Sequence, residues 1–239
     1  VINPELTLTS VTAYEGGDVY SRGDIDGGFG AVFLGDGNYG PGLIPFDAET
    51  ADSVDALTQI TQEVRLASDT DGPFNWQAGF YYFSEDLKIS TINYETLAPG
   101  APVDGFVLQH QNAEAWALFA SANYKLNERW TLAGGLRYSD DSKDYDAIRT
   151  ISPLGFIGQA PSNLITRKVG DEAVSGDISL TYAASEDVNV YGRIARGFRA
   201  PAIQGRILFA FGDGGVSVGD SEILTSFEVG VKSELFDNR

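Results

Sequence analysis

The sequence predicts an all-β protein, an antiparallel up-and-down meander of about eight long strands. The 239 residues include 28 Gly, 11 Tyr, 14 Phe and 3 Trp, a composition that favours strands and turns over a helical bundle. Apolar and polar residues also alternate in many segments, and a period of two places each kind on its own face of a strand. No segment reaches the roughly 18 consecutive apolar residues of a transmembrane helix.

The predicted strands are separated by polar, Gly-rich or Pro-rich segments. Their approximate ranges are 5–15, 59–67, 74–85, 113–125, 130–143, 173–184, 188–198 and 224–235. The strand at 74–85 has the clearest aromatic face, which would be costly to leave in water. The segment 174–201, VSGDISLTYAASEDVNVYGRIARGFRAP, contains two alternating strands joined by a tight polar turn.

Long and short connections alternate along the chain. Long loops are predicted near 16–58, 86–112, 140–172 and 199–223, and short turns separate the strands between them. Successive connections of a meander lie at opposite ends of the sheet, so all long loops should lie at one end. This asymmetry is typical of an outer-membrane β-barrel with short periplasmic turns and long extracellular loops.

Aromatic side chains flank the short turns on the apolar face. Such rings suit a membrane interface, where the ring sits at the boundary and its polar edge reaches water. The predicted interface residues are Phe74, Trp76, Trp116, Tyr124, Trp130 and Tyr182.

Four parts of the sequence resemble the barrel of TonB-dependent outer-membrane receptors. They are TQEVRLAS with FNWQAGFYYF, WALFASANYKLNERWTLAGGLRYSDDSKDY, the segment that ends in RGFRAP, and SFEVGVKSELFDNR. The resemblance implies a 22-stranded barrel closed by an N-terminal plug domain, in the outer membrane of a Gram-negative bacterium. It also implies uptake of a scarce solute, such as a siderophore, cobalamin or saccharide, energised by the TonB complex.

The resemblance further implies four partners: outer-membrane lipid, a plug domain, the TonB complex and a small extracellular solute. The sequence has no recognisable plug, no TonB-contacting segment and no methionine. We therefore expect it to be an internal piece of a longer protein, with about a third of the barrel.

Charged and aromatic residues at strand positions facing the lumen, or at loop entries, are the candidates for solute binding. They are Arg65, Arg137, Tyr191, Arg193 and Arg199. Guanidinium groups bind carboxylates or phosphates well, but ion pairs with neighbouring strands or a plug explain these residues more simply. The acidic residues Asp24, Asp26 and Asp213 lie in Gly-rich segments that suggest calcium loops, although turn chemistry explains them better.

Composition argues against several other functions. A net charge of −18 with no basic stripe argues against nucleic-acid binding. Zero cysteines exclude disulfides and cysteine-ligated metals within the chain, and the single histidine, His110, is expected to be an ordinary strand-end or loop residue. No nucleophile, base and orienting group occur together, so we predict neither an enzyme nor a cofactor.

Two alternatives remain open at this point. A sheet with unpaired edge strands and an apolar face also suits a structural or interaction protein that self-associates through its edges. The acidic Gly-rich loops are also compatible with a secreted calcium-dependent β-sandwich, acting as an adhesin or glycan binder.

Overall fold

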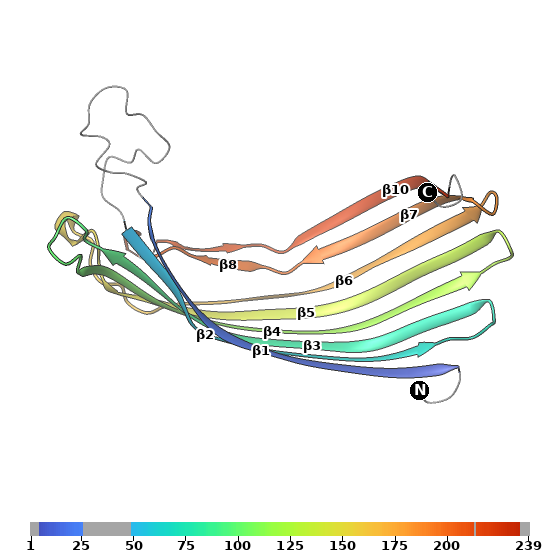
Figure 1. The fold of residues 1–239 in the computed structure, drawn as a ribbon, viewed down its shortest axis with the longest axis horizontal. Coiled ribbons are helices and arrows are strands. Elements are labelled where there is room, and N and C mark those ends of the chain that lie inside the picture. Colours follow the sequence, from blue (N-terminus) through green and yellow to red (C-terminus); the bar gives the residue numbers. More distant parts are fainter. Residues whose placement is uncertain (1–4, 26–48, 213, 235–239) are drawn as a thin grey trace, which may run out of the picture.

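The computed structural model describes residues 5–25, 49–212 and 214–234. Eight long strands form one antiparallel sheet in which each strand pairs with its neighbours along the chain (Figure 1). These strands are β1 (Leu6–Asp24), β2 (Glu49–Ser68), β3 (Phe74–Tyr94), β4 (Val103–Lys125), β5 (Trp130–Ile151), β6 (Ile165–Ala183), β7 (Val188–Arg199) and β10 (Glu222–Ser233). The predicted fold class is therefore confirmed, with β1 and β10 at the two edges of the sheet.

A small hairpin interrupts the connection between β7 and β10. Its strands, β8 (Ala202–Gly205) and β9 (Val216–Gly219), pair with each other and not with the large sheet. The segment before β6 also contains a single 3-10 turn, η2 (Gly155–Ile157). No helix in the described part of the chain is long and apolar enough to cross a membrane.

The predicted asymmetry of the connections is confirmed. Short turns at 69–73, 126–129 and 184–187 lie together at one end of the sheet (Figure 1). The longer connections at 95–102 and 152–164, and the β8–β9 hairpin, lie at the other end. We call this second end the loop end.

The strands are much longer than predicted. Parts of all four predicted long loops are strand, namely 16–24, 49–58, 86–94, 103–112, 140–151, 165–172, 202–205 and 216–219. The prediction was wrong there because these segments carry polar side chains on both faces, so their apolar periodicity is weak. A strand in water needs no apolar face, since its backbone hydrogen bonds to neighbouring strands persist.

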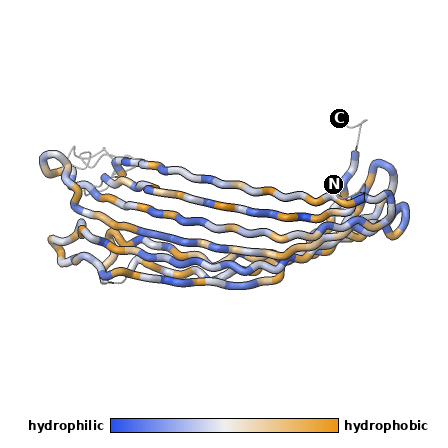
Figure 2. The backbone as a smooth tube through the Cα atoms, turned by 90° about the horizontal axis from the view of Figure 1, so that it is seen from below, coloured by the Kyte–Doolittle hydropathy of each residue, from blue (hydrophilic) through white to orange (hydrophobic). Residues whose placement is uncertain are grey.

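The register gives the sheet two chemically different faces. One row across five strands consists of Val64, Phe80, Leu118, Tyr138 and Val174. The face that carries this row is the outer face, and its large apolar side chains are exposed. Figure 2 shows the alternation of hydrophobic and hydrophilic residues along the strands.

The opposite face, called the inner face, is mostly polar and carries the β8–β9 hairpin at the loop end. The sandwich alternative is wrong for the described residues, because no second large sheet covers the outer face. Phe74, for example, is 49% exposed there.

Candidate solute-binding site

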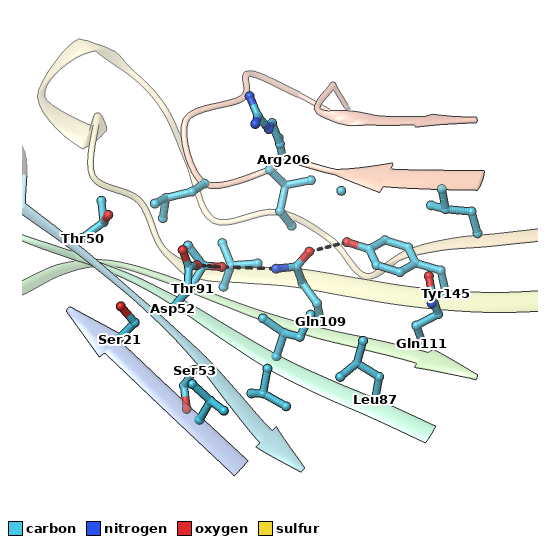
Figure 3. A pocket seen from close by; sticks show the side chains of 18 of the residues that line it. Ser21, Thr50, Asp52, Ser53, Leu87, Thr91, Gln109, Gln111, Tyr145 and Arg206 are labelled. Carbon is cyan, nitrogen blue, oxygen red and sulfur yellow. Dashed lines mark hydrogen bonds between the residues drawn. The ribbon is translucent and has the colours of Figure 1, made fainter. Parts of the chain in front are cut away.

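A cavity of about 830 Å³ opens on the inner face at the loop end (Figure 3). Strands β1 to β5 form its floor, and the segment that includes β8 and the residues after it forms its roof. The walls include Leu87, Ile89 and Val107 from the strands and Ile203 and Ile207 from the roof. The cavity is therefore largely apolar, as small-molecule sites usually are.

Four polar side chains from adjacent strands cross the floor of this cavity. Tyr145 of β5 donates to Gln109 Oε1 at 2.7 Å, and Gln109 Nε2 donates to Thr91 Oγ1 at 3.2 Å. Thr91 Oγ1 then donates to Asp52 Oδ1 at 2.8 Å. We call Asp52, Thr91, Gln109 and Tyr145 the polar row, and Figure 3 shows its hydrogen bonds.

The carboxylate of Asp52 fixes the direction of every bond in the polar row. An ionised carboxylate only accepts hydrogen bonds, so the Thr91 hydroxyl must donate its single proton to Asp52. Towards Gln109 the Thr91 hydroxyl therefore accepts, which requires the amide N–H of Gln109 on that side. The carbonyl of Gln109 then faces Tyr145, whose hydroxyl donates to it. All three donors point towards Asp52.

The two ends of the polar row differ in exposure. Tyr145 is only 6% exposed, and burial raises the pKa of its hydroxyl to about 12. Gly205 of the hairpin lies directly on it, because a Cβ at Gly205 would be 2.6 Å from Tyr145 Cζ. Asp52, by contrast, is exposed, and no cation pairs with it among the described residues.

The roof is held down by a small apolar core. Ile207 and Leu208 are 2% and 6% exposed, and they pack with side chains from the inner face. Those side chains are Val107, Tyr145, Ala147 and Ile165. Burying one large aliphatic side chain stabilises a protein by about 1.5–3 kcal/mol, so these contacts stabilise the packing of the roof on the inner face.

Arg149 fastens two loop-end connections to each other. Its side chain is 2% exposed and donates through Nη2 to the carbonyl of Ala160 and through Nη1 to that of Ala210, both at 2.7 Å. Nη1 also donates to the carbonyl of Ile207. Burial lowers the pKa of this guanidinium, but an arginine remains protonated at neutral pH.

Gln159 forms a second link between the same connections. Its Nε2 donates to the carbonyls of Leu208 at 3.1 Å and Ala210 at 2.8 Å. Its Oε1 accepts from the backbone N–H of Leu154 at 3.2 Å. The roof therefore has a fixed position above the polar row.

Arg206 is the cation that lies at the rim of this cavity. It is exposed, and its guanidinium has no hydrogen-bond or ion-pair partner among the described residues. The charged side chains that line the cavity are thus Asp52 on the floor and Arg206 on the roof.

The five residues predicted to bind solute lie outside the cavity, and each already has a neighbouring partner. The pairs are Arg65 with Glu63 at 3.5 Å, Arg137 with Ser139 at 2.9 Å, Tyr191 with Glu228, Arg193 with Asp177 at 3.1 Å and Arg199 with Glu222 at 3.5 Å. They are spread along the inner face and do not converge on one point, so their role in binding stays a prediction.

The predicted calcium loops lie mostly outside the described residues. Asp26 and Asp213 lie outside the described residues, and Asp24 ends β1. Across 5–25, 49–212 and 214–234, no group of three or more His, Cys, Asp or Glu side chains is arranged to hold a metal ion. His110 lies within β4, where its Nε2 is 2.7 Å from Asp86 Oδ2.

The predicted interface aromatics lie on the outer face, several of them in contact across strands. Trp130 and Tyr182 have ring centroids 4.6 Å apart, and Phe74 and Tyr124 meet edge to face at 6.3 Å. Trp116 lies 5.3 Å from Tyr138. Their position at a membrane interface stays a prediction.

Sequence reasoning missed all four residues of the polar row. Each falls in a segment that was assigned to a loop, although a weak signal was present in 87–92, LKISTI. There Leu87, Ile89 and Thr91 keep the phase of the inner face, while Lys88 and Ser90 alternate with them. The prediction required each strand to keep one apolar face, and for this reason it did not recognise that the strand continues through 87–92.

Comparison with known proteins points to one family. The chain matches the family model "TonB dependent receptor-like, beta-barrel" over residues 3–239. The pesticin receptors of Yersinia enterocolitica and Yersinia pestis are each 28% identical to it over 144 residues, which is 59% of this chain. The chain spans only 20% of the length of either receptor.

Two solved structures share the fold. The ferric yersiniabactin uptake receptor FyuA from Yersinia pestis superimposes with a TM-score of 0.74 over 97% of this chain and 31% of its own, at 17% identity. The closed form of the ferric-catecholate import receptor Fiu from E. coli K12 gives a TM-score of 0.59, covering all of this chain and 37% of its own, at 15% identity.

Proposed function

The chain belongs to the TonB-dependent receptor β-barrel family, and from this premise we propose that it forms part of the wall of an outer-membrane barrel that imports a scarce extracellular solute. We propose a ferric chelate as the first solute class to test, because FyuA and Fiu are named for ferric yersiniabactin and ferric catecholate. TonB-dependent receptors are outer-membrane proteins of Gram-negative bacteria, so this is the location we propose.

The outer face supports a position in a membrane. Along β5, ten residues separate Trp130 from Asp140, which is the register partner of Trp116. Ten residues of strand span about 33 Å, or about 25 Å along the membrane normal at a tilt near 40°. This equals the height of the apolar band of outer-membrane barrels. Glu172 lies in the boundary row, beside Asp140, and Glu114 lies beyond it towards the loop end.

The observation that carries the proposal for solute binding is the cavity at the loop end. A solute arriving from outside would meet this end of the barrel first, and the inner face there offers about 830 Å³ of largely apolar space with a polar floor. The roof is fixed by Arg149 and Gln159, so the cavity is largely preformed.

In the mechanism that we propose, the described residues bind and orient the solute without covalent chemistry. Release into the lumen would follow movement of a plug domain that contacts the inner face and responds to the TonB complex. The paired charges on the inner face, such as Arg193 with Asp177, would form the polar wall along which the solute passes.

Uptake of a radiolabelled ferric chelate tests the proposal. The gene that encodes this chain would be deleted and restored in its own host, and iron uptake from a panel of ferric chelates would be measured under iron limitation. We expect uptake of at least one chelate to require both the gene and an intact TonB complex. Equal uptake of every chelate with and without the gene would contradict the ferric-chelate assignment.

A further inference from the structure

The polar row determines which chemical group the floor of the cavity can bind. Tyr145 and Thr91 each donate their single hydroxyl proton along the row, and Gln109 donates one of its two amide N–H groups, all in the direction of Asp52. Asp52 Oδ1 accepts one of these bonds, and no hydrogen bond to its Oδ2 is present among the described residues. The unused capacity at the open end of the row is therefore that of a hydrogen-bond acceptor.

The surroundings of Asp52 strengthen this bias. The other polar side chains at this end of the cavity, Ser21, Thr50 and Ser53, are hydroxyls and carry no charge. The cation of the cavity, Arg206, lies on the roof, away from the floor. A carboxylate placed on the floor would face the charge of Asp52 at short range, where like charges repel strongly.

The remainder of the cavity has the opposite character. Leu87, Ile89 and Val107 line the floor beside the row, and Ile203 and Leu208 line the roof. A solute that fills this space must bury an apolar surface there while it brings a polar group to Asp52. The two requirements lie at neighbouring parts of one cavity, so one ligand group can meet both.

We propose that the cavity selects solutes whose entering part is an apolar body ending in a hydrogen-bond donor, an ammonium or hydroxyl group, and that it excludes parts ending in a carboxylate. Asp52 is the residue that determines this specificity, and Thr91 positions its carboxylate. The inference rests on the proposed function in one respect, namely that the bound solute is one that the receptor imports. The binding preference itself can be measured with purified protein, without transport.

A cysteine inside the cavity gives a local measure of occupancy. The chain has no cysteine, and Ser21 lines the cavity beside Asp52, so Ser21→Cys adds a thiol of nearly the same size. The complete gene product would be purified in detergent, and alkylation of this thiol by iodoacetamide would be followed by mass spectrometry of its peptide. Binding of a probe to the micelle does not affect this readout directly, because protection requires occupancy of the cavity.

Three probes of one shape separate the possible ligand groups: phenylbutylamine, phenylbutanol and phenylbutanoate. We expect the amine and the alcohol to slow alkylation and the carboxylate to leave the rate unchanged. In the Asp52→Asn background the protecting concentration of the amine should rise about tenfold or more, the usual effect of losing a hydrogen bond to a charged group. Asp144→Asn, on the outer face, should change nothing.

Equal or better protection by the carboxylate would overturn the inference, and so would an unchanged amine effect in Asp52→Asn with an unchanged unprotected rate. If Asp52→Asn changes the rate of alkylation without a probe, the Asp52→Glu variant is used in its place, because it keeps the carboxylate. If the amine then protected the thiol no better than the carboxylate probe does, this result would also count against the inference. The comparison of probes in the Ser21→Cys protein decides the question without any change at Asp52. Failure of chelate uptake with the expected probe pattern would reject the proposed function alone.

Discussion

Gly205 is the residue of the roof that lies directly on the hydroxyl end of Tyr145 in the polar row. A Cβ at this position would overlap the hydroxyl of Tyr145 and lie 3.0 Å from Gln109 Oε1. We expect Gly205→Ala to lift the hairpin and to cost about 1–3 kcal/mol of stability, as overpacking commonly does. Limited trypsin digestion should then cut faster after Arg206, which lies next to it in the sequence.

The opposite strand of the hairpin provides the control for Gly205. The nearest atom to a Cβ at Gly219 would be the carbonyl oxygen of Ala202 at 3.9 Å, an ordinary contact. Gly219→Ala should therefore leave the cleavage rate nearly unchanged. Equal rates in the two variants would show that Gly205 does not pack on Tyr145 as described.

Arg149 should be more important to the loop end than any exposed arginine. Replacing it with Met would leave the carbonyl of Ala160 without a donor among the described residues. The carbonyls of Ile207 and Ala210 would each lose one of two donors, keeping the N–H of Ala210 and the amide of Gln159. A cost of about 1–3 kcal/mol is expected for the one carbonyl left unsatisfied. Hydrogen exchange of the amides in 206–211 should accelerate in Arg149→Met.

Arg167→Met is the comparison for Arg149. The Arg167 guanidinium donates to the carbonyl of its own neighbour, Thr166, at 2.8 Å, and it has no other hydrogen-bond or ion-pair partner among the described residues. Its loss should leave exchange in 206–211 as it was. Similar acceleration in both variants would mean that the roof responds to arginine loss in general.

Tyr145 should make the loop end sensitive to alkaline pH. Its pKa is raised from about 10 to about 12 by burial, so between these values the unfolded chain has lost a proton that the folded chain retains. Stability from this group is therefore complete below pH 10 and falls as the pH rises towards 12, by on the order of 2 kcal/mol in all. Ultraviolet titration of the wild type minus Tyr145→Phe should show one phenol that ionises near pH 12, whereas a midpoint near 10 would contradict the burial.

At the scale of the strands, the sequence identified the membrane-type segments and missed their extensions. The short turns at 69–73, 126–129 and 184–187 were predictable, because compact polar residues separate two clear period-two patterns there. Beyond Asp140, β5 continues for eleven residues with charged side chains on the outer face, where hydropathy gives no signal. Its continuation is determined by pairing with β4 and β6, which is a long-range interaction.

The candidate site could not be predicted from the sequence for the same reason. Asp52, Thr91, Gln109 and Tyr145 lie on four different strands, and only the register brings them into one row. Arg149 was equally hidden, since its partners at 160, 207 and 210 belong to connections without periodicity. Local pattern identifies a strand, whereas a site across strands requires the alignment of several patterns.

The outer faces of β4 and β5 make a prediction about depth in a bilayer. Trp116 and Trp130 should lie near the two boundaries of the apolar band, about 25 Å apart, and Leu136 should lie between them. In variants that retain one of these tryptophans, or that carry Leu136→Trp alone, brominated lipids report the depth of each ring. Bromine near the headgroup should quench Trp116 and Trp130 best, and bromine near the end of the acyl chain should quench Leu136→Trp best. One depth for all three would contradict the membrane assignment of this face.

For the molecule as a whole, the distribution of connections predicts its orientation. Every described long connection lies at the end that carries the cavity, and the three short turns lie at the opposite end. Receptors of this architecture expose long loops to the outside and short turns to the periplasm. The cavity can receive an extracellular solute only in this orientation, so orientation and function are tested together.

Three single-cysteine variants can measure this orientation, because the chain has no cysteine of its own. Leu97, in the connection 95–102, is 71% exposed, and Glu128 is exposed in the turn 126–129. In intact cells a membrane-impermeant maleimide should label Leu97→Cys, while Glu128→Cys should react only after the outer membrane is permeabilised. Phe156→Cys, 84% exposed in the other long connection, should behave as Leu97→Cys does. The reverse pattern would place the cavity in the periplasm, where it would meet a solute only after transport, and the role proposed for Asp52 would then fail with the orientation.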